Sequence, residues 1–307
     1  MTRILLTGKN GQLGFELQRS LAPLGKVTAV EASNCDLSDA SSLQRLVTET
    51  KPEVIINTAA YTAVDRAESQ PDLAHAVNAK APGVLGEAAR AINAWVVHYS
   101  TDYVFDGDKD GRYHEDDTPN PLNVYGKSKR DGELALQQSG ARYFVLRTSW
   151  VVGAHGDNFA KTTLRLAAER DGLKVVSDQV GAPTTAARLA DVTAHLLRQW
   201  QILRRQQLED SNFPWGLYHV SAAGETSWYD YARFVVETAR AAGAKLRMRP
   251  EDIRPIKSAD YPLPARRPAN SRLDSTRFCR TFELKLPDWR LGVAHVLQQL
   301  LDQIPPD

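Results

Sequence analysis

The sequence predicts an α/β fold in which a doubly wound parallel sheet is followed by a smaller C-terminal lobe. Short apolar runs alternate with segments of helical periodicity over the first half of the chain, and a glycine-rich turn follows the first run. After about residue 150 this alternation gives way to a different pattern. Strands that alternate with helices of about 10 to 15 residues are typical of parallel sheets covered on both faces.

Five apolar runs in the first half are predicted to be buried strands. Each run is short, rich in β-branched or aromatic residues, and bounded by glycine, proline or polar residues. The runs occupy residues 3–7, 26–31, 54–57, 95–100 and 143–147.

Helices are predicted where apolar residues recur every three or four positions, as Leu13, Leu17 and Leu21 do. In the first half such helices span residues 12–24, 39–50 and 78–92. In the second half we expect helices over residues 158–169, 189–207 and 226–242, and another strand over 216–220. Residues 250–268 are rich in proline and are expected to be irregular or extended.

The composition argues against several classes of partner. The chain has 307 residues, of which 38 are basic and 37 acidic, so neither a nucleic acid nor an anionic membrane is an expected partner. The two cysteines, Cys35 and Cys279, exclude a disulfide framework and favour a reducing compartment. No apolar stretch approaches the roughly 18 residues of a membrane-spanning helix, and the seven histidines show no metal-ligand spacing. We expect a soluble, cytoplasmic protein.

A glycine-rich turn formed by Gly8, Gly11 and Gly14 joins the first strand to the first helix. Here the first glycine makes a tight turn, the second lets the backbone approach a pyrophosphate, and the third lets the helix pack on the sheet. A glycine turn without a ligand is the alternative. The turn predicts a dinucleotide-binding domain over residues 1–149 and a substrate-binding lobe over 150–307. Segments at about 160–180 and 216–242 are expected to return to the first domain.

Three further positions are candidate cofactor contacts. Glu31 ends the second strand, where a carboxylate binds a ribose 2′-hydroxyl and repels a 2′-phosphate, which favours NAD over NADP. Asp36 can accept the adenine amine while Leu37 covers the ring, and the small residues near position 60 let a dinucleotide pass the third strand. A surface glutamate and a helix-leading aspartate are the alternatives for Glu31 and Asp36.

A candidate catalytic set lies between the fourth and fifth predicted strands. Tyr125 and Lys129 lie one helical turn apart on the same face, with Asn123 as the candidate N-cap. The charge of a nearby lysine lowers the pKa of a phenol, which then donates a proton near neutral pH. Thr101, just after the fourth strand, can hydrogen-bond the oxygen that receives this proton. A surface Tyr–Lys pair and a simple strand-end hydroxyl are the alternatives.

These motifs resemble those of the extended short-chain dehydrogenase/reductases, which have a Rossmann-type domain. More closely, the segments 99–105, 158–159, 182–184, 228–229 and 264–271 look like those of the dTDP-4-dehydrorhamnose reductase family, and the match covers essentially the whole chain. That family uses NADPH or NADH to reduce the C4 ketone of dTDP-4-dehydro-L-rhamnose, the last step of dTDP-rhamnose biosynthesis. By this resemblance Tyr125 protonates the forming alkoxide, Thr101 steadies that oxygen, and Lys129 binds the nicotinamide ribose and tunes the phenol.

The resemblance also implies which residues contact the ligands. The implied substrate contacts are Thr101, Asp102 and Trp150, although Trp150 can instead be a core residue between the lobes. Arg266, with Arg267 and Arg272 nearby, is a candidate for the substrate diphosphate, and solvated surface arginines are the alternative. The expected cofactor contacts are Gly8, Asn10, Gly11, Gln12, Leu13, Glu31, Asp36, Leu37, Ala59, Ala60, Tyr61, Tyr125 and Lys129.

One position separates reduction from the chemistry of a related group of enzymes. Nucleotide-sugar 4,6-dehydratases resemble this chain but carry an acid where it has Tyr103, and a tyrosine is a poor general base at pH 7. Two further alternatives are a regulatory subunit of the methionine adenosyltransferase type and a reductase or epimerase of a related nucleotide sugar.

Some members of the resembled family are dimers bridged by a divalent metal through glutamates. Glu16 is present here, but Ala187 and Gln299 stand at the positions expected for the other two ligands. We therefore expect no bound metal, and a monomer or weak homodimer whose partner is a small nucleotide-sugar substrate.

Overall fold

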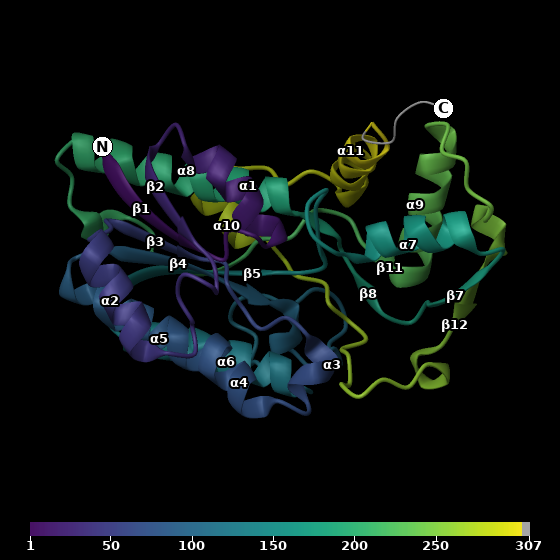
Figure 1. Cartoon of the computed structure of the whole chain (residues 1–307), viewed down its shortest axis with the longest axis horizontal. Helices are drawn as coiled ribbons and strands as arrows, with labels where there is room; N and C mark the ends of the chain where they lie inside the picture. Colours follow the sequence, from purple (N-terminus) through teal and green to yellow (C-terminus); the bar gives the residue numbers. More distant parts are fainter. Residues whose placement is uncertain (303–307) are drawn as a thin grey trace.

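A six-stranded parallel sheet forms the first lobe of the computed structural model, which describes residues 1–302 apart from the side chain of Asp210 (Figure 1). The strand order is β10-β5-β4-β3-β1-β2, so the predicted doubly wound α/β class is confirmed. The connection after β1 leads to β2 on one side and the connection after β3 leads to β4 on the other, which opens a ligand crevice at the carboxyl ends of β1 and β3. The strands are β1 (Thr2–Thr7), β2 (Gly25–Val30), β3 (Val54–Asn57), β4 (Trp95–Thr101), β5 (Arg142–Thr148) and β10 (Gly216–His219).

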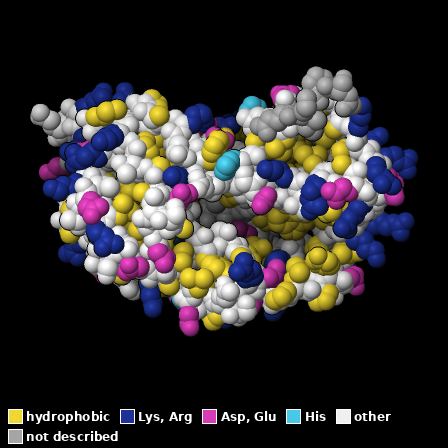
Figure 2. All heavy atoms as spheres, in the orientation of Figure 1, with side chains coloured by type: hydrophobic (Ala, Val, Ile, Leu, Met, Phe, Trp, Pro, Cys, Tyr) yellow, Lys and Arg dark blue, Asp and Glu magenta, His cyan; other side chains and the backbone are white. Residues whose placement is uncertain are grey.

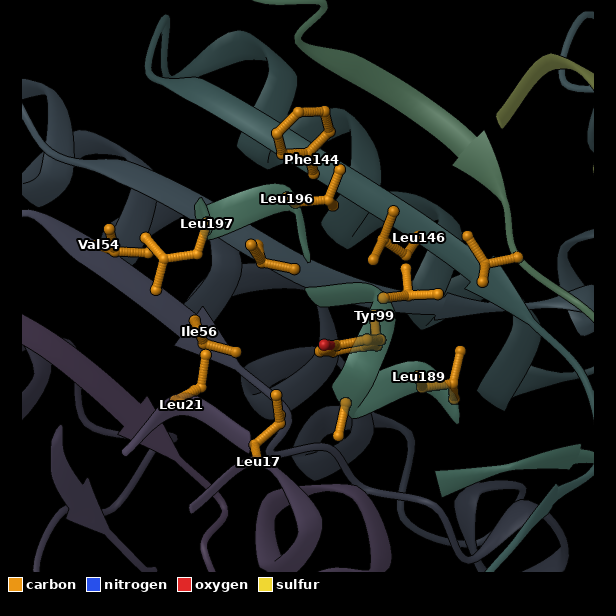
Figure 3. Close-up of a cluster of buried hydrophobic side chains, with 14 of the residues drawn as sticks. Leu17, Leu21, Val54, Ile56, Tyr99, Phe144, Leu146, Leu189, Leu196 and Leu197 are labelled. Carbon is orange, nitrogen blue, oxygen red and sulfur yellow. The ribbon is translucent and has the colours of Figure 1, made fainter. Parts of the chain in front are cut away.

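Helices cover both faces of this sheet. On one face the buried side chains of α1 and α8 meet those of β3, β4 and β5, as Leu17, Leu197 and Phe144 do in Figure 3. On the other face Leu43, Leu85 and Leu136 pack against the sheet from three helices. The first face carries α1 (Gln12–Leu21), α8 (Ala186–Arg205) and α10 (Thr276–Thr281), and the second carries α2 (Ala40–Thr50), α5 (Ala81–Ala91) and α6 (Val124–Gln138).

The second lobe consists of three helices and three pairs of short strands. Its two apolar clusters centre on Tyr231 and Trp289 and on Val236 and Met248. The helices are α7 (Phe159–Glu169), α9 (Trp228–Ala241) and α11 (Trp289–Leu301). The strand pairs are β6 (Val151–Val152) with β9 (Thr184–Thr185), β7 (Leu173–Val176) with β12 (Ile253–Ile256), and β8 (Val180–Gly181) with β11 (Thr226–Ser227).

Short elements connect these parts of the chain. The predicted helix over residues 78–92 begins earlier, because α4, a π-helical turn and α5 run on without a break. The proline-rich residues 250–268 contain two single turns and one short strand, in line with the expected irregular or extended backbone. The connectors are α3 (Val64–Ala67), α4 (Pro71–His75), the π-helix η1 (Ala76–Lys80), and the 3₁₀ turns η2 (Asp102–Val104), η3 (Asp210–Asn212), η4 (Pro250–Asp252) and η5 (Ser258–Asp260).

The segments that return to the first lobe differ from those expected. Of the predicted segments 160–180 and 216–242, only β10 enters the large sheet, where it pairs with β5. Residues 160–180 stay in the second lobe because β7 pairs with β12, and α9 stays there because it packs against α7 and α11. Helices α8 and α10 also return to the first lobe, where α8 packs against α1 and α10 packs against β10.

Candidate functional site

The glycine-rich turn lies between the ends of β1 and β3. Gly8 has φ +77°, and a Cβ on it would lie 2.8 Å from the backbone nitrogen of Ala59. A Cβ on Gly14 would lie 2.0 Å from the carbonyl oxygen of Gly8, so the protein's own packing requires both glycines. A Cβ on Gly11 would meet only the Gly8 oxygen, at 3.4 Å. Gly11 therefore leaves space that the described chain does not fill, at the start of α1, where free amides attract an anion.

Glu31 lies beside this turn, directly after β2. Its carboxylate accepts hydrogen bonds from Asn10 Nδ2 and from the Ser33 hydroxyl, and it lies 3.7 Å from Lys9 Nζ. The glycine turn thus places the Lys9 ammonium next to the Glu31 carboxylate, which is expected to discriminate between NAD and NADP.

The other expected adenine-side residues differ in exposure. Leu37 is buried in the core under α2, so packing accounts for it without a ligand. The exposed Asp36 carboxylate accepts hydrogen bonds from the amide and hydroxyl of Ser38, both at 2.8 Å. Ala59, Ala60 and Tyr61 are half-buried after β3, at the same edge of the sheet as the glycine turn.

The helix that carries the candidate catalytic pair is held close to the end of β4. Asn123 caps α6 by accepting a hydrogen bond of 2.8 Å from the Gly126 amide, as predicted. A Cβ on Gly126 would lie 2.2 Å from the carbonyl oxygen of Tyr103, so this glycine lets α6 approach η2. The close approach places Tyr125 against the end of β4.

Tyr125 and Thr101 meet at the carboxyl end of β4. Burial raises the pKa of Tyr125 to about 12, and a hydrogen bond with the Thr101 side chain acts in the opposite direction. We expected the charge of Lys129 to lower this pKa, but burial and the charge of Asp102 raise it, and the opposing influence comes from Thr101 and not from Lys129. The Thr101 hydroxyl also donates to Asp102 Oδ1 and accepts from the Tyr103 amide, each at 3.1 Å.

Lys129 is 2% exposed, one turn further along α6. Its ammonium donates to the carbonyl oxygen of Tyr99 at 2.7 Å and lies 3.2 Å from His98 Nε2. Burial lowers the pKa of Lys129 to about 8, while the charge of Glu133 raises it. A lysine has three hydrogens, so one is left for a ligand among the residues that the structure describes.

Asp102 is a buried carboxylate with one free oxygen. Oδ1 accepts from Thr101, whereas Oδ2 has no hydrogen-bond partner within residues 1–302. Burial raises the pKa of Asp102 to about 6, and the Ser271 and Thr101 side chains nearby oppose the rise. A buried acceptor without a partner suits a ligand hydroxyl, because an unsatisfied polar atom costs stability.

Trp150 lies where the chain passes into the second lobe. It has φ +48°, a left-handed conformation that non-glycine residues seldom adopt. Its ring stacks on Trp228 with 3.6 Å between centroids, and a Cβ on Gly181 would lie 2.7 Å from its Cε2 atom. The indole is therefore fixed against the second lobe and only partly buried.

The three candidate diphosphate arginines have different partners. Arg267 forms hydrogen bonds of 2.7 and 3.0 Å with the Asp65 carboxylate, and Arg272 bonds to Asn270 and lies 3.5 Å from Glu225. Arg266 is exposed and its side chain makes no hydrogen bond or ion pair within the described chain. It lines a cavity of about 480 Å³ together with residues 258–259 and 261–265, Asp106 and Asp178.

The second lobe touches the glycine turn through residues that the sequence did not suggest. His155 Nε2 lies 3.0 Å from the carbonyl oxygen of Asn10, and Asn158 Nδ2 donates to Gln12 Oε1 at 3.0 Å. Figure 2 shows the molecule hollowed between the two lobes on this side. No periodicity could have indicated His155, because its role depends on how the lobes meet.

Two other expectations concern metals and membranes. Within residues 1–302 no three histidine, cysteine or carboxylate side chains are grouped so that they could hold a metal ion, and Glu16 pairs with Arg19. Among the described helices, none combines the length and the apolar character that crossing a bilayer requires.

Comparison with known proteins gives close relatives over nearly the whole chain. The profile described as "RmlD substrate binding domain" matches residues 1–302. A dTDP-4-dehydrorhamnose reductase of Escherichia coli K12 is 47% identical over 97% of each chain, and one of Burkholderia thailandensis is 46% identical over 98% of this chain and 100% of its own. The crystal structure of the Bacillus anthracis dTDP-4-dehydrorhamnose reductase in complex with NADP is 33% identical, covers 99% of each chain and has a TM-score of 0.86.

Proposed function

The chain belongs to the dTDP-4-dehydrorhamnose reductase family, a family of NAD(P)H-dependent oxidoreductases, and we propose that it reduces the C4 ketone of dTDP-4-dehydro-L-rhamnose to give dTDP-L-rhamnose. The observation that carries the proposal is the contact between the side chains of Tyr125 and Thr101 beside the crevice of the sheet. The phenol of Tyr125 and the hydroxyl of Thr101 thus lie together at the carboxyl end of β4, at the same end of the sheet as the glycine turn that can hold a cofactor.

The residues around the glycine turn fit a nicotinamide dinucleotide. The open space at Gly11 and the amides that begin α1 suit a pyrophosphate, and the free hydrogen of Lys129 suits a ribose hydroxyl. When bound, the reduced cofactor supplies a hydride to the carbonyl carbon of the substrate. Lys9 lies beside Glu31 and offsets its negative charge, so the site can accept either NADH or NADPH.

Tyr125 is suited to donate the proton. Because its pKa is raised to about 12, the phenol stays protonated at neutral pH, which is the form that a ketone reductase needs at the start of the reaction. The carbonyl oxygen becomes more basic as reduction proceeds, and it then takes the phenolic proton. The Thr101 hydroxyl has one proton, which it gives to Asp102 Oδ1 in the free protein, so it turns toward the substrate to donate a hydrogen bond to the same oxygen. The Lys129 ammonium stabilises the phenolate that remains.

The substrate is held by the opposite wall of the hollow. Asp102 Oδ2 is available to accept from a sugar hydroxyl, and Trp150 presents a fixed aromatic surface to the sugar ring. The unpaired Arg266 is suited to the diphosphate, since a guanidinium binds phosphate oxygens in a fork. We further propose that the protein acts as a monomer or weak homodimer.

The structure supports reduction over dehydration. Burial and the charge of Asp102 both raise the pKa of Tyr103, so its phenol stays protonated at neutral pH and is even less available as a general base than an ordinary tyrosine. A general base at this position is what the 4,6-dehydratases would need. The intact contact of Tyr125 with Thr101 likewise favours catalysis over a purely regulatory role.

A direct assay tests this proposal. The purified protein is mixed with dTDP-4-dehydro-L-rhamnose generated in situ, and the absorbance of NADH or NADPH is followed. We expect cofactor oxidation that depends on the nucleotide sugar. A stoichiometric complex with another protein, together with no oxidation of either cofactor, would instead support the regulatory alternative.

A further inference from the structure

A row of polar side chains crosses three strands beneath Lys129. Thr7, Asn57 and His98 are neighbours in the register of β1, β3 and β4, so their side chains lie on one face of the sheet. The Thr7 hydroxyl donates to Asn57 Oδ1 at 2.6 Å, and Asn57 Nδ2 lies 3.1 Å from His98 Nδ1. His98 Nε2 completes the row at 3.2 Å from Lys129 Nζ.

The row is buried in an otherwise apolar face. None of its four side chains is more than 2% exposed, and the preceding residues on this face, Leu5, Ile55 and Val96, belong to the core beneath α5 and α6. Polar side chains placed here lose their hydration, which only a complete set of hydrogen bonds offsets. Packing alone would favour apolar residues at these three positions.

We propose, on the basis of the proposed function, that His98 is a positioning residue that holds Lys129 Nζ for the cofactor ribose. Through Asn57 and Thr7, His98 also links the charge state of Lys129 to the hydrogen bonds of the row. The row ends at Thr7, directly before Gly8, so it also ties Lys129 to the start of the glycine turn.

The coupling follows from the donors and acceptors in the row. His98 is neutral, since burial and the charge of Lys129 hold its pKa well below the usual range, so its ring carries one proton. When Thr7 donates to Asn57 and Asn57 donates to Nδ1, the proton lies on Nε2 and faces a neutral amine. When Lys129 is an ammonium that donates to Nε2, the proton moves to Nδ1 and the Asn57 amide turns over. The ammonium therefore excludes the Nε2-protonated tautomer, whereas a neutral amine can accept from it, so loss of the charge releases the tautomer that the bonds from Thr7 and Asn57 favour.

Few other ionisable groups act on Lys129. On its own helix Glu133 raises its pKa, and that carboxylate is bound by Arg147 of β5 at 2.6 and 2.9 Å. Tyr125 lies one turn before it, with a phenol that is neutral at the pH considered. On β4 the groups that face Lys129 are His98 and the Tyr99 carbonyl.

The first test compares variants by the dissociation constant of NADPH, measured by fluorescence without any nucleotide sugar. His98→Phe removes the hydrogen-bond acceptor from Lys129 Nζ, so we expect NADPH to bind about tenfold more weakly. The loss of NADPH affinity at alkaline pH should begin roughly one pH unit lower than in the wild type. His98→Gln keeps a hydrogen-bonding group and should restore most of the affinity. The control is His219→Phe, which removes another buried neutral histidine that bonds to the Tyr113 carbonyl.

Unchanged NADPH affinity and pH dependence in a folded His98→Phe protein would overturn the proposal, as would an equal loss in the His219→Phe control. Because cofactor binding alone is measured, a wrong sugar substrate would leave this result intact.

The second test uses the wild-type protein, so it does not depend on how the variants fold. In a sample with ¹⁵N-labelled histidine, the ring nitrogens of His98 should exchange their protonated and unprotonated shifts around pH 8, where Lys129 titrates. A His98 ring that keeps one tautomer throughout this pH range would contradict the coupling.

Discussion

At the scale of single residues, the site combines groups whose burial opposes their charge. Tyr125, Lys129 and Asp102 all lie under the carboxyl end of β4. Burial shifts the pKa of each in the direction that favours its uncharged form, upward for Tyr125 and Asp102 and downward for Lys129. The pattern is typical of functional sites, because a core built for stability alone would avoid three ionisable side chains in one place. The sequence predicted which residues meet, through motif spacing. It could not predict the direction of the Tyr125 shift, which depends on burial of the phenol beside Tyr103 of η2.

The pH dependence of stability tests the state of Asp102. Its pKa is about 6 in the folded protein and near 3.9 when unfolded, so the folded state binds more protons between these values. Stability therefore falls as pH rises from about 4 to 6, and the loss is complete above that window. We expect Asp102→Asn to be about 2 to 3 kcal/mol more stable than wild type at pH 8, and no more stable below pH 4, by urea unfolding. The control Asp72→Asn, at an exposed position, should show no such pH-dependent difference from the wild type. If the free energy of unfolding of Asp102→Asn follows that of the wild type at every pH, the Asp102 carboxylate is charged in the fold without cost.

Steady-state kinetics test the assignment of Arg266. Replacing it with alanine removes the one guanidinium at the cavity that has no partner within residues 1–302, so the KM for the nucleotide sugar should rise about tenfold while kcat changes little. The KM for NADPH should stay constant. Arg254→Ala, an exposed arginine on β12, serves as the control. If both variants keep the wild-type KM, the diphosphate is bound elsewhere.

At the scale of elements, the start of α1 and the start of α6 each depend on glycines that serve different purposes. Gly8, Gly14 and Gly126 are required by contacts within the chain, whereas Gly11 is not. The motif spacing predicted the turn, since glycines at this spacing after a strand and in the first turn of a helix are typical of a dinucleotide-binding turn. It gave no sign of Gly126, whose importance comes from the distance between α6 and Tyr103.

Two alanine substitutions separate folding from binding at the glycine turn. Gly14→Ala places a Cβ 2.0 Å from the Gly8 carbonyl oxygen, so the free energy of unfolding should fall by about 2 to 3 kcal/mol. Gly11→Ala should leave thermal stability near that of wild type and weaken NADPH binding at least tenfold, because its Cβ enters space kept for the ligand. A Gly11→Ala protein that binds NADPH normally would show that the pyrophosphate does not pass this residue.

At the scale of the whole molecule, the lobes are interleaved along the chain. Five of the six strands and the main helices of the first lobe follow one another, and periodicity was enough to predict them. Helix α8 and strand β10 come back from the second half (Figure 1). An apolar stripe shows that a helix is buried but not which surface covers it, so the expected return of residues 160–180 was wrong. The lobe contacts at His155 and Asn158 escaped prediction for the same reason.

The central claim is that Tyr125 donates the proton in reduction of a nucleotide 4-keto sugar. The most direct measurement is the yield of dTDP-L-rhamnose per NADPH oxidised, for wild type and for Tyr125→Phe, with Tyr143→Phe on β5 as a control. We predict one product molecule for each NADPH in the wild type and in the control, and a kcat at least 100-fold lower in Tyr125→Phe with NADPH still bound. Near-wild-type turnover by Tyr125→Phe, or NADPH oxidation without this product, would contradict the account.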